Sequence, residues 1–309
     1  MIARMYQVNR NSQSEFVPIR SLSYHVRRWG NPHAEKTPLV LLHGWMDVAA
    51  SFQFVVDALQ HDHFIIAPDW RGFGLTVSGG ADCFWHPDYL ADLDALLDHY
   101  APGQRVNLVG HSMGANVAMI YAGVRPERVR CLINLEGFGL PSTRPEQAGG
   151  RYAHWMNEVK QFNNGALQLK TYDSLEAVAA RLMKTNQRLN PDKARWLAAH
   201  WSAELAPGQW SILGEAAHKI VSAHLYREDE TLAIFRCITA PTLMLEASDD
   251  GMMMLWWRGQ FTMAQHRERL KSVPNIEIAQ VPDCGHMLHH DQPQAVAHLI
   301  EQFVLAHGA

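Results

Sequence analysis

Cysteines, long apolar runs and runs of like charge are all scarce in this chain. Its four cysteines are far apart and form no C-x-x-C pair, which argues against a zinc ribbon, a redox motif or a disulfide framework. No apolar stretch approaches the length of about 18 residues that a membrane-spanning helix needs. The opening segment, MIARMYQVNRNSQSEF, shows no apolar region or cleavage site of a secretion signal. We therefore expect a cytoplasmic protein with free thiols and no membrane partner.

The charge balance excludes a further class of partner. The net charge is −4, from 27 basic and 31 acidic residues, without a basic tract. This argues against binding to nucleic acid or to an anionic lipid surface. With 309 residues, 47% of them hydrophobic, the chain is long enough for a substantial core. The oligomeric state stays open.

Buried strands and helices alternate in the first part of the chain. Residues 16–29 suggest two antiparallel strands, and continuous apolar runs, typical of strands covered on both faces, follow at 38–42, 63–67, 106–109 and 129–135. The pattern predicts a doubly wound, mostly parallel sheet of the α/β class.

An insertion interrupts this alternation. The next buried strand comes only at 241–245, and the residues between are too many for one crossover. Their helical patterns predict a helical cap inserted after the sixth strand. This gives three segments, the core at 1–138, the cap at 139–232 and the core again at 233–309. Two interpretations are open for the four tryptophans of the cap: they line a substrate pocket, or they pack the cap against the core. These residues are Trp155, Trp196, Trp201 and Trp210. Helices are expected at 255–270 and from Pro293 to Phe303.

Ser112 stands at the apex of a predicted strand-turn-helix. The sequence Val109-Gly110-His111-Ser112-Met113-Gly114 follows an apolar strand and opens a helix of small residues. A turn this sharp needs glycines two residues before and two after the apex. The hydroxyl of Ser112 is then lifted above the sheet, as a nucleophile requires.

A serine nucleophile needs a histidine base, and the base must sit at the same edge of the sheet. His286 follows the predicted strand 276–281 and precedes the last helix. Its alternatives are an ordinary turn histidine or a metal site with His289 and His290, and no H-E-x-x-H pattern supports the metal. We predict no metal and no cofactor.

The carboxylate that orients the base has more than one candidate. Asp249 and Asp250 follow the strand at 241–245, and Glu136 follows the strand just before the cap. Either strand end can reach the histidine in such a sheet.

These motifs, taken together, resemble the α/β-hydrolase superfamily in its capped, serine-esterase-like branch. The matching segments are LVLLHGW, DWRGFGLT, LVGHSMGANVA, PTLMLEASDD and VPDCGHMLHHDQP, in the family's order. The resemblance implies that the backbone N–H groups of Trp45 and Met113 form the oxyanion hole. It also implies the order nucleophile, acid, histidine. Aligned from Pro241, the acid falls on Asp250.

The alignment of the acid departs from the family pattern at one point. Ala247 stands where the family's turn has a glycine. The departure leaves Asp249 possible, and relatives that take the acid from the preceding strand leave Glu136 as the alternative.

The expected activity is hydrolysis of a small carboxylic ester or lactone through an acyl-enzyme on Ser112. Hydrolysis of a carbon-carbon bond by the same residues is an alternative. A non-catalytic ligand-binding protein of this fold is another. The expected partner is a small ester-like substrate.

Overall fold

The computed structural model describes residues 5–32 and 37–307. An eight-stranded sheet with the order β1-β2-β4-β3-β5-β6-β10-β11 forms its centre. The strands are β1 (Gln13–Ile19), β2 (Leu22–Trp29), β3 (Leu39–Leu42), β4 (Ile65–Pro68), β5 (Val106–His111), β6 (Val129–Leu135), β10 (Thr242–Ala247) and β11 (Ile276–Val281). β2 is antiparallel to β1 and β4, and from β4 to β11 all neighbours are parallel. Residues 1–4, part of the segment in which no secretion signal was found, lie outside the described residues.

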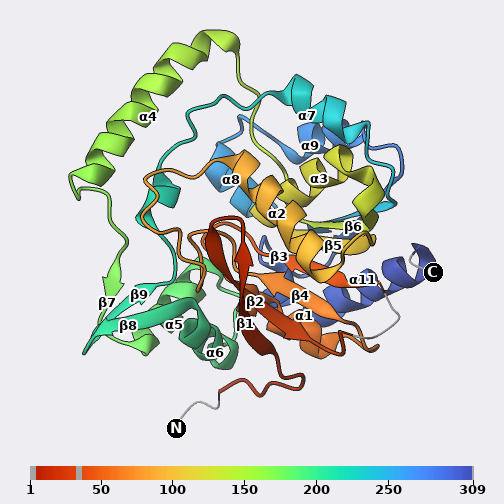
Figure 1. Ribbon diagram of the computed structural model, residues 1–309, viewed down its shortest axis with the longest axis horizontal. Coiled ribbons are helices and arrows are strands. Elements are labelled where there is room, and N and C mark those ends of the chain that lie inside the picture. The colour runs from red at the N-terminus through yellow and green to blue at the C-terminus, as the bar shows by residue number, and fades with distance from the viewer. Residues whose placement is uncertain (1–4, 33–36, 308–309) are drawn as a thin grey trace.

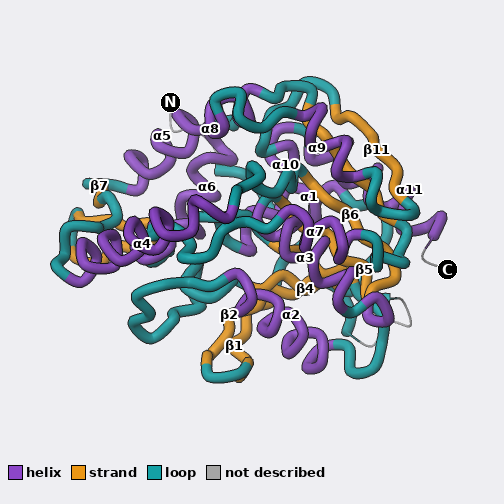
Figure 2. Tube along the Cα trace, turned by 90° about the horizontal axis from the view of Figure 1, so that it is seen from above, coloured by secondary structure: helices purple, strands orange, loops and turns teal. Residues whose placement is uncertain are grey.

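Helices cover both faces of the sheet (Figures 1 and 2). One layer contains α2 (His86–Tyr100), α3 (Met113–Val124), α7 (Glu228–Phe235) and α9 (Met263–Leu270), and the other α1 (Gln53–Ala58), α10 (Leu288–Asp291) and α11 (Pro293–His307). Along β3, Val40 and Leu42 pack in the first layer, whereas Leu39 and Leu41 pack in the second. A strand buried on both sides must be apolar throughout, which explains the continuous runs in the sequence. The doubly wound, mostly parallel sheet is confirmed.

The segment between β6 and β10 leaves the central sheet, as the sequence predicts. It contains α4 (Ala148–Asn163), α5 (Leu175–Thr185) and α6 (Pro191–Trp201). It also forms a second, antiparallel sheet of β7 (Thr171–Tyr172), β9 (Gln209–Ile212) and β8 (Ser202–Ala206). The inserted cap thus combines the predicted helices with a small antiparallel sheet. A Pro207-Gly208 turn, with Gly208 at φ +71°, reverses the chain between β8 and β9.

The C-terminal end of the cap differs from the predicted boundary at residue 232, which falls inside α7. This helix packs closely on α3, because a Cβ atom added at Gly123 would lie 2.3 Å from the carbonyl oxygen of Ile234. α7 therefore belongs to the helical layer over the central sheet.

The two ends of the cap pack differently. Trp196 on α6 is buried against Phe54, with ring centroids 5.6 Å apart, and the indole N–H of Trp201 donates to the carbonyl of Met46 over 3.0 Å. These two tryptophans attach the cap to the core. By contrast, α4 has no buried residue and lies away from the sheet in Figure 1, with Tyr152 and Met156 exposed.

The helix predicted over 255–270 is two helices, α8 (Gly251–Trp257) and α9. The break lies at Arg258 and Gly259, whose φ values of +47° and +79° cannot continue a right-handed helix. Thr262 then caps α9, its side chain accepting from the amide of Gln265. Across the described part of the chain, no helix combines the length and apolar character that crossing a membrane requires.

Candidate active site

Ser112 occupies the sharp turn between β5 and α3. Its backbone has φ +51° and ψ −114°, a strained conformation for a residue with a side chain. The two flanking glycines are sterically required. An added Cβ would lie 2.5 Å from the backbone of Ala115 at Gly110, and 2.2 Å from the carbonyl oxygen of Leu42 at Gly114. The elbow predicted from the sequence therefore has the geometry that presents a serine hydroxyl.

His286 lies beside this hydroxyl. It stands on the loop after β11, is buried, and has Nε2 at 3.0 Å from Oγ of Ser112. The structure thus brings together the two residues that the sequence paired as nucleophile and base.

Glu136 provides the carboxylate next to the histidine. It follows β6 directly, is buried, and has Oε2 at 3.4 Å from Nδ1 of His286. Its other oxygen, Oε1, accepts from the amide of Ala247 over 2.6 Å. This hydrogen bond fixes the position of the carboxylate. The backbone φ of Glu136 is +58°, which marks a sharp turn directly after the strand.

The sequence-based preference for Asp250 at this contact is corrected. β10 continues to Ala247, and the turn that follows directs Asp249 and Asp250 to the surface, where both are exposed. Asp249 pairs with Arg188 over 2.9 Å, and Asp250 precedes α8 as its N-cap residue. For the described residues, the hydrogen-bond and ion-pair geometry connects His286 to Glu136 and not to either aspartate.

Burial sets the protonation states of the two groups. It lowers the pKa of His286 to about 4, so the ring is neutral at neutral pH and able to accept a proton. Burial raises the pKa of Glu136, and the amide of Ala247 acts in the opposite direction by stabilising the ionised form. Burial therefore disfavours an isolated charge on either group, and the carboxylate and the imidazolium stabilise each other when His286 takes up a proton.

The two predicted oxyanion donors belong to α3 and to the loop after β3. Met113 is the first residue of α3, so its amide has no carbonyl partner within the helix. The loop that carries Trp45 approaches the nucleophile closely, because a Cβ added at Gly44 would lie 3.2 Å from Cβ of Ser112. The Trp45 side chain is exposed, and its indole N–H donates to the carbonyl of His218 in the cap over 3.2 Å.

The loop 69–76 is held in place by buried hydrogen bonds. Asp69 is buried, accepts from the amides of Ala49 and Leu75, and contacts Nδ1 of His25. The amide of Trp70 donates to Nε2 of His43 over 2.9 Å. These bonds hold the loop that carries Trp45.

Comparison with known proteins identifies the family. The family model described as the alpha/beta hydrolase fold matches residues 37–293, most of the chain. The chain belongs to this α/β-hydrolase family. The sequence-based identification is confirmed, and with it hydrolase activity at the level of the family.

Relatives of this α/β-hydrolase span nearly its whole length. A serine hydrolase-like protein from Danio rerio is 27% identical over 304 residues, 96% of this chain and 89% of that protein. A probable serine hydrolase from Drosophila melanogaster is 32% identical over 295 residues, 89% of this chain and 82% of that protein. A crystal structure of a hypothetical protein from Pseudomonas aeruginosa PAO1 has a TM-score of 0.80 at 22% identity, covering 95% and 98% of the two chains. The last similarity shows the fold.

Two aromatic residues of this α/β-hydrolase that sequence reasoning missed lie against the histidine. Trp256 of α8 has its ring centroid 4.9 Å from that of His286, and Phe138 lies at 5.8 Å. Trp256 belongs to an apolar run, Met252 to Trp257, that follows the exposed aspartates. Such a run after a strand was a signal available in the sequence, and its position beside the active site was not.

Proposed function

We propose that the protein hydrolyses a carboxylic ester or lactone through an acyl-enzyme on Ser112. The observation that carries the proposal is the continuous contact from Oγ of Ser112 to Nε2 of His286, at 3.0 Å, and from Nδ1 to the buried carboxylate of Glu136, at 3.4 Å. A hydroxyl, an imidazole and a carboxylate in this order generate a serine nucleophile at neutral pH.

The proposed reaction has two half-reactions. In the first, Oγ of Ser112 attacks the carbonyl carbon while its proton passes to Nε2 of His286, and the leaving alcohol takes that proton as its bond to the acyl carbon breaks. In the second, His286 accepts a proton from water, whose oxygen attacks the acyl carbon. The bond between this carbon and Oγ then breaks, His286 returns the proton to Oγ of Ser112, and the acid is released. Glu136 orients the ring and stabilises its charged form. The amides of Met113 and Trp45 are the proposed donors to the negative oxygen.

The surroundings of the histidine favour an apolar acyl group. Trp256 contacts the His286 ring, and Met254 and Leu255 on the same short helix are exposed apolar side chains. An acyl chain that covers such surface is removed from water, and each buried methylene adds about 0.8 kcal/mol to binding.

The test combines covalent labelling with an ester screen. A fluorophosphonate probe is expected to label the wild-type protein and Ser23→Ala, which changes an exposed serine, but not Ser112→Ala. The wild-type protein and Ser23→Ala are expected to hydrolyse p-nitrophenyl esters with acyl chains of two to twelve carbons. In Ser112→Ala this turnover is expected to fall by more than a hundredfold. Alanine is smaller than serine and fits the elbow, so the thermal unfolding temperature should stay unchanged.

The remaining outcomes separate the alternatives. Labelling without turnover of any ester would point to another bond, such as a carbon-carbon bond, cleaved by the same residues. Absence of labelling in the folded wild-type protein would contradict the proposal and favour a ligand-binding role.

A further inference from the structure

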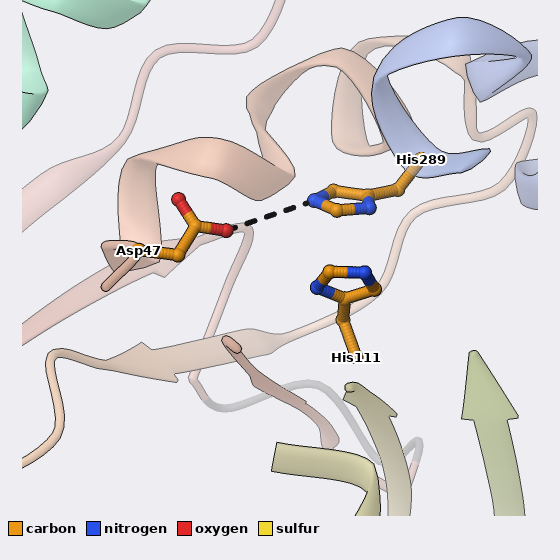
Figure 3. Close-up of side chains that lie close together, drawn as sticks. All are labelled: Asp47, His111 and His289. Atoms are coloured by element: carbon orange, nitrogen blue, oxygen red, sulfur yellow. Dashed lines mark ion pairs between the residues drawn. The ribbon is translucent and has the colours of Figure 1, made fainter. Parts of the chain in front are cut away.

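A buried polar cluster adjoins the nucleophile, since one of its members, His111, precedes Ser112 in the chain. It consists of Asp47 on the loop after β3, His111 at the end of β5, and His289 on α10 (Figure 3). Their exposed fractions are 6%, 2% and 0%. One nitrogen or oxygen atom from each lies within 4.8 Å of the others. Three elements far apart in sequence thus direct their polar atoms into one interior volume.

Atoms in this cluster lack hydrogen-bond partners. Oδ2 of Asp47, Nδ1 of His111 and Nδ1 of His289 are buried without one. Native proteins rarely leave buried polar atoms unsatisfied, since each costs free energy of folding. Within the described residues, Asp47 forms an ion-pair contact with His289, whose Nε2 lies 3.8 Å from Oδ2. No lysine or arginine of these residues forms an ion pair with the carboxylate. The cluster therefore has the features of a site completed by a cation.

The protonation of His111 can be derived from its contacts. Its Nε2 lies 2.8 Å from the carbonyl oxygen of His286, so Nε2 carries the proton and donates. Nδ1 of the ring has no hydrogen-bond partner, so its lone pair is free to face the cluster. A histidine that binds a metal through one nitrogen and donates from the other to a backbone carbonyl has this arrangement.

His289 is equally suited to ligation. Its side chain is completely buried. Its Nε2 faces Asp47, as the dashed line in Figure 3 shows, and the hydroxyl of Ser51 lies 2.9 Å from the same nitrogen. A small shift of this hydroxyl leaves the lone pair of Nε2 available to an ion.

The donor set selects the metal. Two imidazoles and one carboxylate match Zn²⁺ and similar transition metals, whereas Mg²⁺ and Ca²⁺ require oxygen ligands. With zinc–ligand bonds of about 2.0–2.2 Å, the ligand atoms of a tetrahedral site lie about 3.3–3.6 Å apart. The ligand atoms lie within 4.8 Å of one another, which exceeds this spacing by about 1.2–1.5 Å at most, so modest side-chain movement closes the site.

We propose that Asp47, His111 and His289 form a Zn²⁺ site, and that its occupation inhibits the enzyme. The inhibitory effect rests on the proposed hydrolytic function, whereas the binding does not. His111 precedes the nucleophile and donates to the carbonyl of His286, and their ring centroids lie 4.9 Å apart. Closing the site around an ion moves the His111 ring, and its hydrogen bond to the carbonyl of His286 then shifts that residue relative to Ser112. Because a misplacement of about 1 Å at reacting groups can cost a hundredfold in rate, the rate should fall by about tenfold or more.

The first experiment measures binding directly. The chelator-treated wild-type protein is titrated with ZnCl₂ by calorimetry, together with Asp47→Asn and His289→Gln. The matched control is His154→Gln, because His154 is exposed and forms a surface pair with Glu158 over 2.8 Å. One zinc per chain is expected in the wild type and the control, and none in Asp47→Asn and His289→Gln. Circular dichroism reports whether each variant folds.

A second probe does not depend on the variants. Co²⁺ bound to the wild-type protein in a tetrahedral site gives strong visible absorption bands, which surface histidines in an octahedral environment do not give. Absence of zinc binding, or one zinc per chain retained in folded Asp47→Asn, would overturn the site. If His289→Gln fails to fold, the zinc titration of Asp47→Asn and the cobalt spectrum of the wild type decide whether the site binds metal.

The effect on activity is measured separately. ZnCl₂ is expected to reduce ester hydrolysis by the wild type and by His154→Gln, and EDTA is expected to restore it. The rate of Asp47→Asn should not change when ZnCl₂ is added. Zinc binding without inhibition would refute the inhibitory part alone. A protein that hydrolyses no ester even with EDTA would refute the proposed function, and the calorimetry would still decide the metal site.

Discussion

Glu136 and Asp250 differ in what their carboxylates contact. Glu136 is buried, with one oxygen at the His286 ring and the other on the amide of Ala247. Asp250 is exposed at the start of α8. A carboxylate stabilises an imidazolium strongly only at short range and away from water, because solvent screens the attraction.

The two carboxylates should therefore respond differently to amide substitution. Glu136→Gln keeps an acceptor for the Ala247 amide but removes the charge and favours the wrong histidine tautomer. Its kcat should fall by about 10³–10⁴-fold. Asp250→Asn should stay within about threefold of wild type. Steady-state kinetics on folded variants checks both, and a severe loss in Asp250→Asn alone would show that the turn after β10 rearranges to supply the acid.

Burial of His286 also determines the pH dependence of the rate. The base must be unprotonated, so activity is present above its pKa and lost as the pH falls through it. Because burial lowers this pKa to about 4, the acid limb of kcat/KM should lie below the 6.5 of a free histidine.

The measurement uses buffers containing EDTA, with tryptophan fluorescence at each pH to show that the protein remains folded. A midpoint between about 4 and 6 is expected. A midpoint at 6.5 or above would mean that the charge of Glu136 outweighs the effect of burial.

Among the secondary-structure elements, α8 connects surface and active site. It begins at Gly251, directly after the exposed aspartates, and ends at Trp257, where Arg258 and Gly259 turn the chain into the left-handed region. This short helix places Trp256 against His286 while Met254 and Leu255 stay exposed. The position of the break thus decides which aromatic side chain lies against His286.

Trp256→Ala should change the preference for acyl length. Loss of the indole removes apolar contact area from long chains more than from acetate. We expect kcat/KM for a decanoyl ester to fall by about tenfold, which corresponds to about 1.4 kcal/mol, and that for acetate by less than about threefold.

The control for α8 is Leu305→Ala, which removes an exposed apolar side chain on α11. It should leave both rates unchanged. Equal losses for both esters in Trp256→Ala would assign the indole to positioning His286 and not to the acyl group.

Buried histidines give the whole molecule a sensitivity to acid. Burial lowers the pKa of several well below 6.5: His111, His218, His266, His286, His289 and His290. Below pH 6.5 these residues take up protons in the unfolded chain but not in the folded one. Stability is therefore full above the unfolded pKa and falls as the pH drops toward the folded values. Glu136 acts in the opposite sense, because its raised pKa lets the folded state keep a proton.

The free energy of unfolding should fall between pH 7 and pH 5. Each such histidine contributes about 1.4 kcal/mol per pH unit below 6.5. Urea denaturation at both pH values, with EDTA present, checks this. His218 is stacked between Phe73 and Phe84, with centroids 3.6 Å away on each side. His218→Gln should reduce the pH dependence by about one proton, and the exposed His154→Gln should not. Equal stability at pH 5 and pH 7 in the wild type would contradict the argument.

The sequence by itself determined the features that depend on neighbouring residues. The elbow at Ser112 requires glycines two residues to either side, so its pattern is local. The buried strands were readable because a strand covered on both faces is apolar throughout. The position of His286, between the last strand and the last helix, also followed from chain order.

Only the tertiary structure decided which carboxylate meets His286 and which buried side chains share a site. The end of β6 and the end of β10 offer a carboxylate with similar local signals, and the choice depends on how each turn leaves the sheet. Glu136 turns into the interior, whereas the turn after β10 exits to solvent. Likewise, Asp47, His111 and His289 meet because β3, β5 and α10 converge. Contacts between residues distant in sequence depend on strand order and side-chain packing, which local patterns do not encode.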